Sequence, residues 1–181
     1  MTVIVNLFGG PGTGKSTTAA RLFSDLKALR INSELVREYV KDWAWGERRI
    51  TPLNQIHFLG EQAYRESLLY GKVSAVITDS PLMLCAFYQQ HYSDQSYLLD
   101  TTKAFMRHSS SLHDVRHVNI FLIRTKEYDK SGRFETEEEA IEIDKSLFNF
   151  LSSNDEIHAV VRFDEYDSIL KEVLSAIRFD K

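Results

Sequence analysis

The chain has 181 residues, of which 43% are hydrophobic and 12% aromatic, and its formal net charge at pH 7 is −4. This is enough material for one domain with a substantial core, and it leaves no general excess of cations for binding duplex nucleic acid. The one cysteine, Cys85, excludes an intramolecular disulfide and a zinc site built from several cysteines. With no secretory signal pattern and no apolar run long enough to span a bilayer, we expect a cytoplasmic protein without membrane contact.

Apolar runs that predict strands alternate along the chain with segments of helical periodicity. Strands are predicted at residues 3–8, 33–37, 74–78, 118–123 and 159–163. Helices are predicted at residues 16–29, 52–70, 81–88, 97–112, 136–151 and 166–177. Such alternation indicates a mostly parallel sheet with helices on both faces, and ligands of these sheets bind beyond the carboxyl ends of the strands.

A glycine-rich segment follows the first predicted strand and fits the pattern G-x-x-x-x-G-K-[ST] from Gly9 to Ser16. Glycines allow successive backbone N–H groups to curl around phosphate oxygens, and the following helix adds the positive end of its dipole. Lys15 is expected to pair with the β- and γ-phosphates of ATP, and the Ser16 hydroxyl to bind Mg²⁺. The predicted nucleotide-binding residues are Gly10, Pro11, Gly12, Thr13, Gly14, Lys15, Ser16 and Thr17.

The acid after the third predicted strand, Asp79, is a second candidate for this site. It is placed to reach Mg²⁺ or its water shell from the strand next to the loop, although a helix cap ahead of Pro81 is the alternative. Ring-forming ATPases normally carry paired acids at this point, and guanine-nucleotide switches need an Asn-Lys-x-Asp motif that this sequence lacks.

Charged residues also mark the second strand and the segment after the fourth. Glu34 is expected to face the acceptor hydroxyl as a general base, and Arg37 to hold a substrate group or a phosphate. The alternative for both is a solvated helix start. Residues from about 124 to 136 are expected to form a lid that excludes water from ATP, with Arg124 and Arg133 reaching the transferred phosphoryl group.

Together these segments resemble P-loop kinases of the ribosylnicotinamide-kinase type, which are related to deoxynucleoside and nucleoside monophosphate kinases. The resemblance covers roughly residues 3–150, and of its motifs the phosphate loop is the specific one. The other segments that carry it are Glu34 with Arg37-Glu38-Tyr39, Gln55 to Gln62, Thr78-Asp79-Ser80 and Gly132-Arg133. Asp79-Ser80 departs from the Asp-Arg or Glu-Arg pair typical of deoxynucleoside kinases.

The resemblance implies an α/β P-loop NTPase fold, a three-layer αβα sandwich whose five-stranded parallel sheet has the order 2-3-1-4-5. It implies one kinase domain over residues 1–181. Glu34 or Asp79 becomes the acid nearest the acceptor hydroxyl, and Gln62 with aromatic residues such as Tyr39, Trp43 or Phe58 becomes part of the acceptor pocket.

We therefore expect an ATP- and Mg²⁺-dependent phosphotransferase that acts on a small nucleoside-like or nucleotide acceptor as a monomer or homodimer. Two alternatives stay open. Residues 42–49 mix tryptophans with Arg48 and Arg49, a combination that stacks bases and holds phosphates, and viral kinases of 5-hydroxymethyluracil in DNA resemble the same group. Those tryptophans would otherwise anchor a lid helix. The third reading is a P-loop ATPase that drives a partner.

Overall fold

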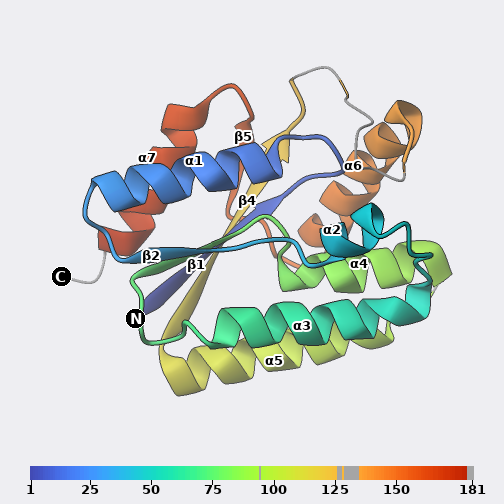
Figure 1. Ribbon diagram of the computed structural model, residues 1–181, viewed down its shortest axis with the longest axis horizontal. Helices are drawn as coiled ribbons and strands as arrows, with labels where there is room; N and C mark the ends of the chain where they lie inside the picture. The colour runs from blue at the N-terminus through green and yellow to red at the C-terminus, as the bar shows by residue number, and fades with distance from the viewer. Residues whose placement is uncertain (94, 126–127, 129–134, 179–181) are drawn as a thin grey trace.

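Short apolar segments form a parallel sheet of order β2-β3-β1-β4-β5 in the computed structural model of the chain, which describes residues 1–93, 95–125, 128 and 135–178 (Figure 1). The strands are β1 (Thr2–Phe8), β2 (Ser33–Val36), β3 (Ala75–Thr78), β4 (Val115–Ile123) and β5 (Ala159–Arg162). Every residue of β1 is buried, as expected for the central strand of a sheet that is covered on both faces. The predicted strand order is confirmed.

Helices cover the two faces of the sheet and give the fold three layers (Figure 1). α1 (Lys15–Ala28) and α7 (Tyr166–Arg178) lie on one face. The other face carries α3 (Gln55–Ser67), α4 (Leu82–Ser93), α5 (Tyr97–His113) and α6 (Glu137–Ser152). The connection between β2 and α3 contains α2 (Val40–Trp45) and the 3₁₀ turn η1 (Pro52–Asn54). No helix in the described ranges is long and apolar enough to cross a bilayer.

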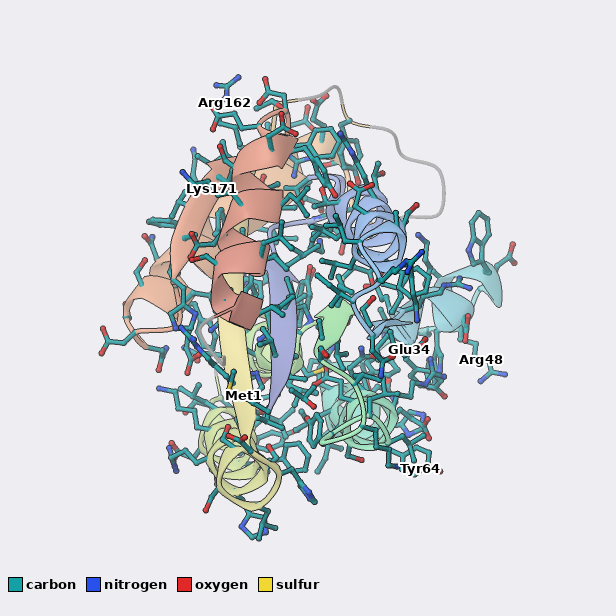
Figure 2. The ribbon with its side chains drawn as sticks, turned by 90° about the vertical axis from the view of Figure 1, so that its left-hand side faces the viewer. Met1, Glu34, Arg48, Tyr64, Arg162 and Lys171 are labelled. Atoms are coloured by element: carbon teal, nitrogen blue, oxygen red, sulfur yellow. The ribbon has the colours of Figure 1, made fainter. Side chains whose placement is uncertain are left out.

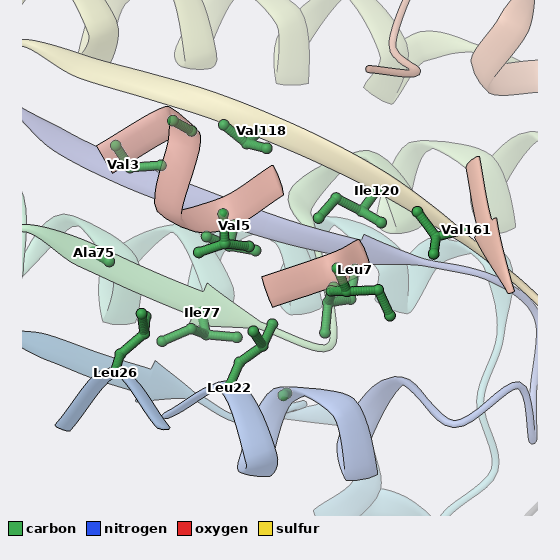
Figure 3. Close-up of a cluster of buried hydrophobic side chains, with 14 of the residues drawn as sticks. Val3, Val5, Leu7, Leu22, Leu26, Ala75, Ile77, Val118, Ile120 and Val161 are labelled. Atoms are coloured by element: carbon green, nitrogen blue, oxygen red, sulfur yellow. The ribbon is translucent and has the colours of Figure 1, made fainter. Parts of the chain in front are cut away.

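The alternation of side chains along β1 explains the two cores. Val3, Val5 and Leu7 pack against α1 and α7, together with Leu22 and Leu26 of α1 (Figure 3). The even-numbered residues of the strand point to the opposite face, where the helices from α3 to α6 cover them.

Two predicted helices differ from the observed ones. The segment predicted at 52–70 is divided into η1 and α3, because Thr51 and Asn54 form a reciprocal cap around Pro52. The helix predicted at 81–88 continues to Ser93. The reason is the buried Gln89, whose Nε2 donates to Ser93 Oγ at 2.8 Å and whose Oε1 accepts from the Leu98 amide at 3.5 Å. Periodicity of apolar residues alone could not reveal that a polar residue lies inside.

One carboxyl group, that of Glu66 in α3, is fully buried. Tyr70 Oη donates to Glu66 Oε2 at 3.4 Å, and Oε1 has no partner in the described part of the chain. Burial raises the pKa of Glu66 to about 8, and the Tyr70 hydrogen bond opposes this only in part. The folded protein therefore holds this carboxyl in its neutral form at pH 7.

We expect Glu66→Gln to flatten the pH dependence of stability. The folded pKa is raised, so the contribution of Glu66 is fully present below the unfolded pKa of 4.5 and is lost as pH rises through about 8. The upper bound of the loss is roughly 5 kcal/mol. Urea unfolding at about pH 5 and about pH 9 should show a steeper loss for the wild type than for the variant.

Glu61→Gln, in the same helix at a half-buried position, serves as the control and should keep the wild-type slope. Equal slopes for Glu66→Gln and the wild type would contradict the assignment of a neutral buried carboxyl.

Candidate nucleotide and acceptor site

The loop between β1 and α1 lies at the carboxyl edge of the sheet and has a conformation that depends on glycine. Gly12 and Gly14 have φ of 79° and 100°, which side-chain-bearing residues rarely adopt. A Cβ at Gly14 would lie 2.2 Å from Phe163 Cδ2, and one at Gly12 would lie 3.0 Å from Arg124 Nη1. Phe163, after β5, and Arg124, after β4, therefore pack closely against the loop and leave no space for side chains at these glycines.

Lys15 is folded onto this loop. Its Nζ donates to Gly9 O at 2.7 Å and to Gly10 O at 2.9 Å. Burial lowers the pKa of Lys15, while the carboxylates of Glu38, Asp79 and Asp144 raise it. The ammonium is therefore held by the loop backbone and lies near three carboxylates.

A cavity of about 690 Å³ opens beside the loop, between α2, α3 and α4. Six of the eight predicted nucleotide-binding residues line it: Pro11, Gly12, Gly14, Lys15, Ser16 and Thr17. The other two lie behind them, where Thr13 Oγ1 donates to Gly10 O at 3.0 Å. The remaining wall is mostly apolar or aromatic, with Phe58, Leu84, Cys85 and Tyr88, and has a few polar groups. This size and mixture are typical of small-molecule sites.

Gln62, which is expected in the acceptor pocket, is a buried polar residue of that wall. It is 1% exposed and lines the cavity, and its Nε2 donates to Thr78 Oγ1 at 3.2 Å. The same hydroxyl accepts from the Ser80 amide at 3.1 Å, which ties α3 to the end of β3. Gln62 Oε1 has no protein partner within the described residues. A hydroxyl or N–H of a ligand would satisfy it.

The acid that faces the cavity from β2 is Glu38, which the sequence analysis did not select as a base. Its backbone N–H donates to Asp79 Oδ1 at 3.0 Å, and this bond joins the ends of β2 and β3. Burial raises the pKa of the Glu38 carboxyl; Lys15 lowers it and Asp79 raises it. Because β2 ends at Val36, the rule that ligands bind beyond the carboxyl ends of strands favours Glu38 over any residue inside the strand.

Glu34 lies outside the cavity, contrary to the expectation that it faces the acceptor (Figure 2). It stands near the start of β2, beside Val76 of β3, and its side chain is 46% exposed. Lys27 Nζ of α1 donates to Glu34 Oε1 at 3.1 Å. Arg37 is exposed and does not line the cavity either.

Of the aromatic residues predicted for the acceptor pocket, Tyr39 and Trp43 differ in their position relative to the cavity. Tyr39 lines the cavity, and its hydroxyl is 3.1 Å from His57 Nε2. Trp43 does not line it and instead packs edge-on against Phe58, with ring centroids 5.0 Å apart. Trp43 therefore anchors α2 to α3, while Trp45 is 68% exposed.

Arg124, at the end of β4, contacts the phosphate loop. Its Nη2 donates to Pro11 O at 2.7 Å, and the guanidinium forms an ion pair with Asp144 of α6 at 2.8 Å. No sequence motif marks Asp144. Arg133 and most of the expected lid at 124–136 lie outside the described residues; of this segment, Tyr128 Oη donates to Glu135 O at 2.7 Å.

The two candidate metal ligands differ in exposure. Ser16 is exposed and lines the cavity, whereas Asp79 is 5% exposed and accepts from the Glu38 amide. Among the residues with described positions, no group of three or more His, Cys, Asp or Glu could hold a metal ion. This donor set fits Mg²⁺, which keeps several waters and takes few protein ligands in phosphate sites.

Comparisons with known proteins agree with this architecture. The AAA_28 family profile, described as an AAA domain, matches residues 4–164. No curated protein matches the chain. Among solved structures, the NadR protein in complex with NR superposes with a TM-score of 0.70 at 18% identity, covering 98% of this chain and 51% of that one. This chain therefore spans about half of the NadR length.

Two further structures cover nearly the whole of both chains. Deoxyadenosine kinase from M. mycoides, with products dCMP and dCDP bound, has a TM-score of 0.59 at 16% identity and covers 97% of this chain and 99% of that one. The APS kinase CysC of Mycobacterium tuberculosis, in complex with AMPPNP and APS, has a TM-score of 0.51 at 11% identity, with 96% of each chain covered. At these identities the likeness shows the fold, that of P-loop kinases.

We expect Gly14→Ala to disrupt the loop. The added methyl group would strain the backbone at φ 100° and overlap the Phe163 ring, which should destabilise the protein by about 1–3 kcal/mol or more and weaken nucleotide binding. Gly60→Ala is the matched control, because Gly60 lies in α3 with nothing within 4 Å of the added carbon. It should gain up to about 1 kcal/mol of stability. Thermal unfolding with and without MgATP measures both, and an unaffected Gly14→Ala would contradict the loop geometry.

Proposed function

The chain belongs to the AAA_28 family of AAA domains, and on that premise we propose that it is a kinase that transfers a phosphoryl group from ATP, with Mg²⁺, to a hydroxyl of a small nucleoside-like acceptor. The observation that carries the proposal is one cavity with Lys15 and the phosphate loop at one end, Glu38 at its edge, and the free Gln62 Oε1 in its wall. A site that only hydrolyses nucleotide does not need the apolar wall of Phe58, Leu84 and Tyr88 that this cavity has in addition to the loop.

The loop residues fit a nucleotide triphosphate. Only glycine fits at Gly12 and Gly14, so backbone N–H groups can approach phosphate oxygens there, and α1 directs the positive end of its dipole to the same point. Lys15 would hold the β- and γ-phosphates, and Ser16 with Asp79 would hold Mg²⁺ directly or through water. ATP supplies the phosphoryl group, and Mg²⁺ neutralises charge on its oxygens.

Glu38 takes the role of general base in this proposal. Its carboxylate would accept the proton of the acceptor hydroxyl while the hydroxyl oxygen attacks the terminal phosphorus of ATP. The bond from that phosphorus to the bridging oxygen breaks, and ADP leaves. Burial raises the pKa of Glu38, which makes its carboxylate a stronger proton acceptor than that of an exposed glutamate, and Lys15 opposes this shift. Gln62 orients the acceptor by accepting a hydrogen bond from it, and Phe58 and Tyr88 provide apolar surface for a flat ring. Arg124, and Arg133 from the lid, remain proposed contacts of the phosphates.

The direct test is transfer of label from radiolabelled ATP to a panel of nucleosides, nucleotides and ribosylnicotinamide. At least one acceptor should be labelled. Rapid ATP hydrolysis together with no labelled product from any acceptor would instead support the third reading, an ATPase that drives a partner.

We expect Glu38→Gln to lower turnover by a factor of about 10² to 10⁴, the usual contribution of a general base, with MgATP binding changed much less. Glu34→Gln removes the same charge four residues earlier, inside β2 and outside the cavity, and should keep turnover within about twofold of the wild type. Steady-state kinetics on the best acceptor of the panel compares them. The reverse ranking would return the base role to Glu34.

A second candidate function has its own observation. Trp45 is 68% exposed, Arg48 is exposed with its guanidinium 5.4 Å from the centre of the Trp43 ring, and Lys41 and Arg49 line the cavity (Figure 2). An exposed aromatic ring with cations can hold a single strand while one base enters a pocket. A DNA-base kinase would place label in acid-precipitable DNA, with binding that weakens as salt is raised.

A further inference from the structure

Asp144 of α6 binds the phosphate loop and an arginine with its two carboxylate oxygens. Oδ1 accepts from the Gly10 amide at 2.5 Å, across 134 positions of the sequence. Oδ2 accepts from Arg124 Nε at 2.9 Å and from Nη2 at 2.8 Å. One side chain thus connects three elements: the loop after β1, the end of β4, and α6.

These contacts are shielded from water. The side chains of Arg124 and Asp144 are 12% and 18% exposed. Hydrogen bonds between charged groups in such surroundings are stronger than those at the surface, and losing one partner leaves the other charge buried without compensation. The arrangement is therefore held firmly, unlike the exposed pair of Lys27 and Glu34.

The guanidinium of Arg124 retains one unused donor. Nε and Nη2 are occupied by Asp144, and Nη2 also donates to Pro11 O at 2.7 Å. Nη1 is buried without a partner among the described residues. It lies beside Gly12, since a Cβ built there would be 3.0 Å from it, and Gly12 lines the cavity. A buried donor in this position costs free energy unless a ligand accepts from it.

We infer that Asp144 is a positioning residue for the nucleotide: it fixes the phosphate loop at Gly10 and holds Arg124 so that Nη1 donates to the bound nucleotide. The inference rests on the nucleotide-binding role proposed above. The negative charge of Asp144 also raises the pKa of Lys15, which opposes the larger, lowering effect of burial. Asp144 itself does not contact the reacting atoms.

The variants separate the two contacts. Asp144→Asn retains an oxygen for the Gly10 amide but cannot pair with the Arg124 charge, whereas Asp144→Ala loses both. Glu142→Gln removes an exposed acid two residues away and serves as the control. The readouts are amide hydrogen exchange at Gly10 in the ligand-free protein, followed by NMR, and the Kd for MgATP from calorimetry.

We expect Gly10 exchange to accelerate at least tenfold in Asp144→Ala and to stay near the wild-type rate in Asp144→Asn. The Kd for MgATP should rise by about tenfold in Asp144→Asn and by more in Asp144→Ala, with the KM of the acceptor unchanged. Arg124→Gln should weaken MgATP binding as much as Asp144→Asn, and combining the two should add little, because the pair acts as one unit.

Three outcomes would overturn the inference: a Kd within twofold of the wild type in both Asp144 variants, unchanged Gly10 exchange in Asp144→Ala, or fully additive effects of Asp144→Asn and Arg124→Gln. If Asp144→Ala does not fold, Asp144→Asn and the double variant decide. A wild-type protein that binds no MgATP would instead remove the proposed function itself, together with the donor role of Arg124.

Discussion

The buried central strand β1 is the constraint on which the site depends. Because β1 is paired with β3 on one side and β4 on the other, both in parallel, the carboxyl ends of all three strands meet at one edge. The register places Asn6 beside Thr78 and Phe8 beside Phe121, so the residues that follow each strand converge on the glycine loop. Asp79 and Arg124 reach that loop for this reason, although they come from distant parts of the sequence. A register shift of one residue in either pair would turn their side chains to the wrong face.

Local patterns account for what the sequence predicts well. The phosphate loop is one uninterrupted motif, and the strand order follows from the resemblance that this motif supports. The position of Glu34 could not be read from the strand boundary, which the sequence predicts to within one residue. Glu34 is the second residue of β2 and pairs with Lys27, whereas Glu38 lies two residues beyond the end of the strand and lines the cavity. The sequence could not identify Asp144. Its partner is the backbone amide of Gly10, 134 residues away, and a backbone amide is present at almost every position of a sequence. Trp43 and Trp45 are the same residue type two positions apart, so the sequence does not tell them apart. In the structure, Trp43 packs against Phe58 and anchors α2, whereas the ring of Trp45 is exposed.

Of the seven buried polar side-chain atoms without a hydrogen-bond partner among the described residues, two belong to the site. In the part of the chain with described positions, Gln62 Oε1 and Arg124 Nη1 are buried without protein partners next to the cavity and the loop. Glu66 avoids the larger cost of a buried charge by remaining protonated, so its free oxygen belongs to a neutral group. A change of protonation is not open to the two atoms at the site, because one is an amide oxygen and the other belongs to a guanidinium group. A ligand that pairs with either atom would form the hydrogen bond that the folded chain alone leaves unmade.

The charges around the loop add a further condition. Three carboxylates, Glu38, Asp79 and Asp144, act on Lys15, and Arg124 is the second cation of the group. With two cationic and three acidic side chains, the surroundings of the loop have no net positive charge, so net charge cannot be what attracts a triphosphate. The attraction has to come from directed donors: the loop amides, the start of α1, and Arg124 Nη1, all of which act at hydrogen-bond distance. Asp79 and Glu38 then repel phosphate oxygens unless a divalent cation or a proton stands between them. In the proposed kinase, these acids would disfavour bare nucleotide relative to its magnesium complex. Burial is the main cause of the raised pKa of Glu38; Asp79 adds to the shift and Lys15 opposes it.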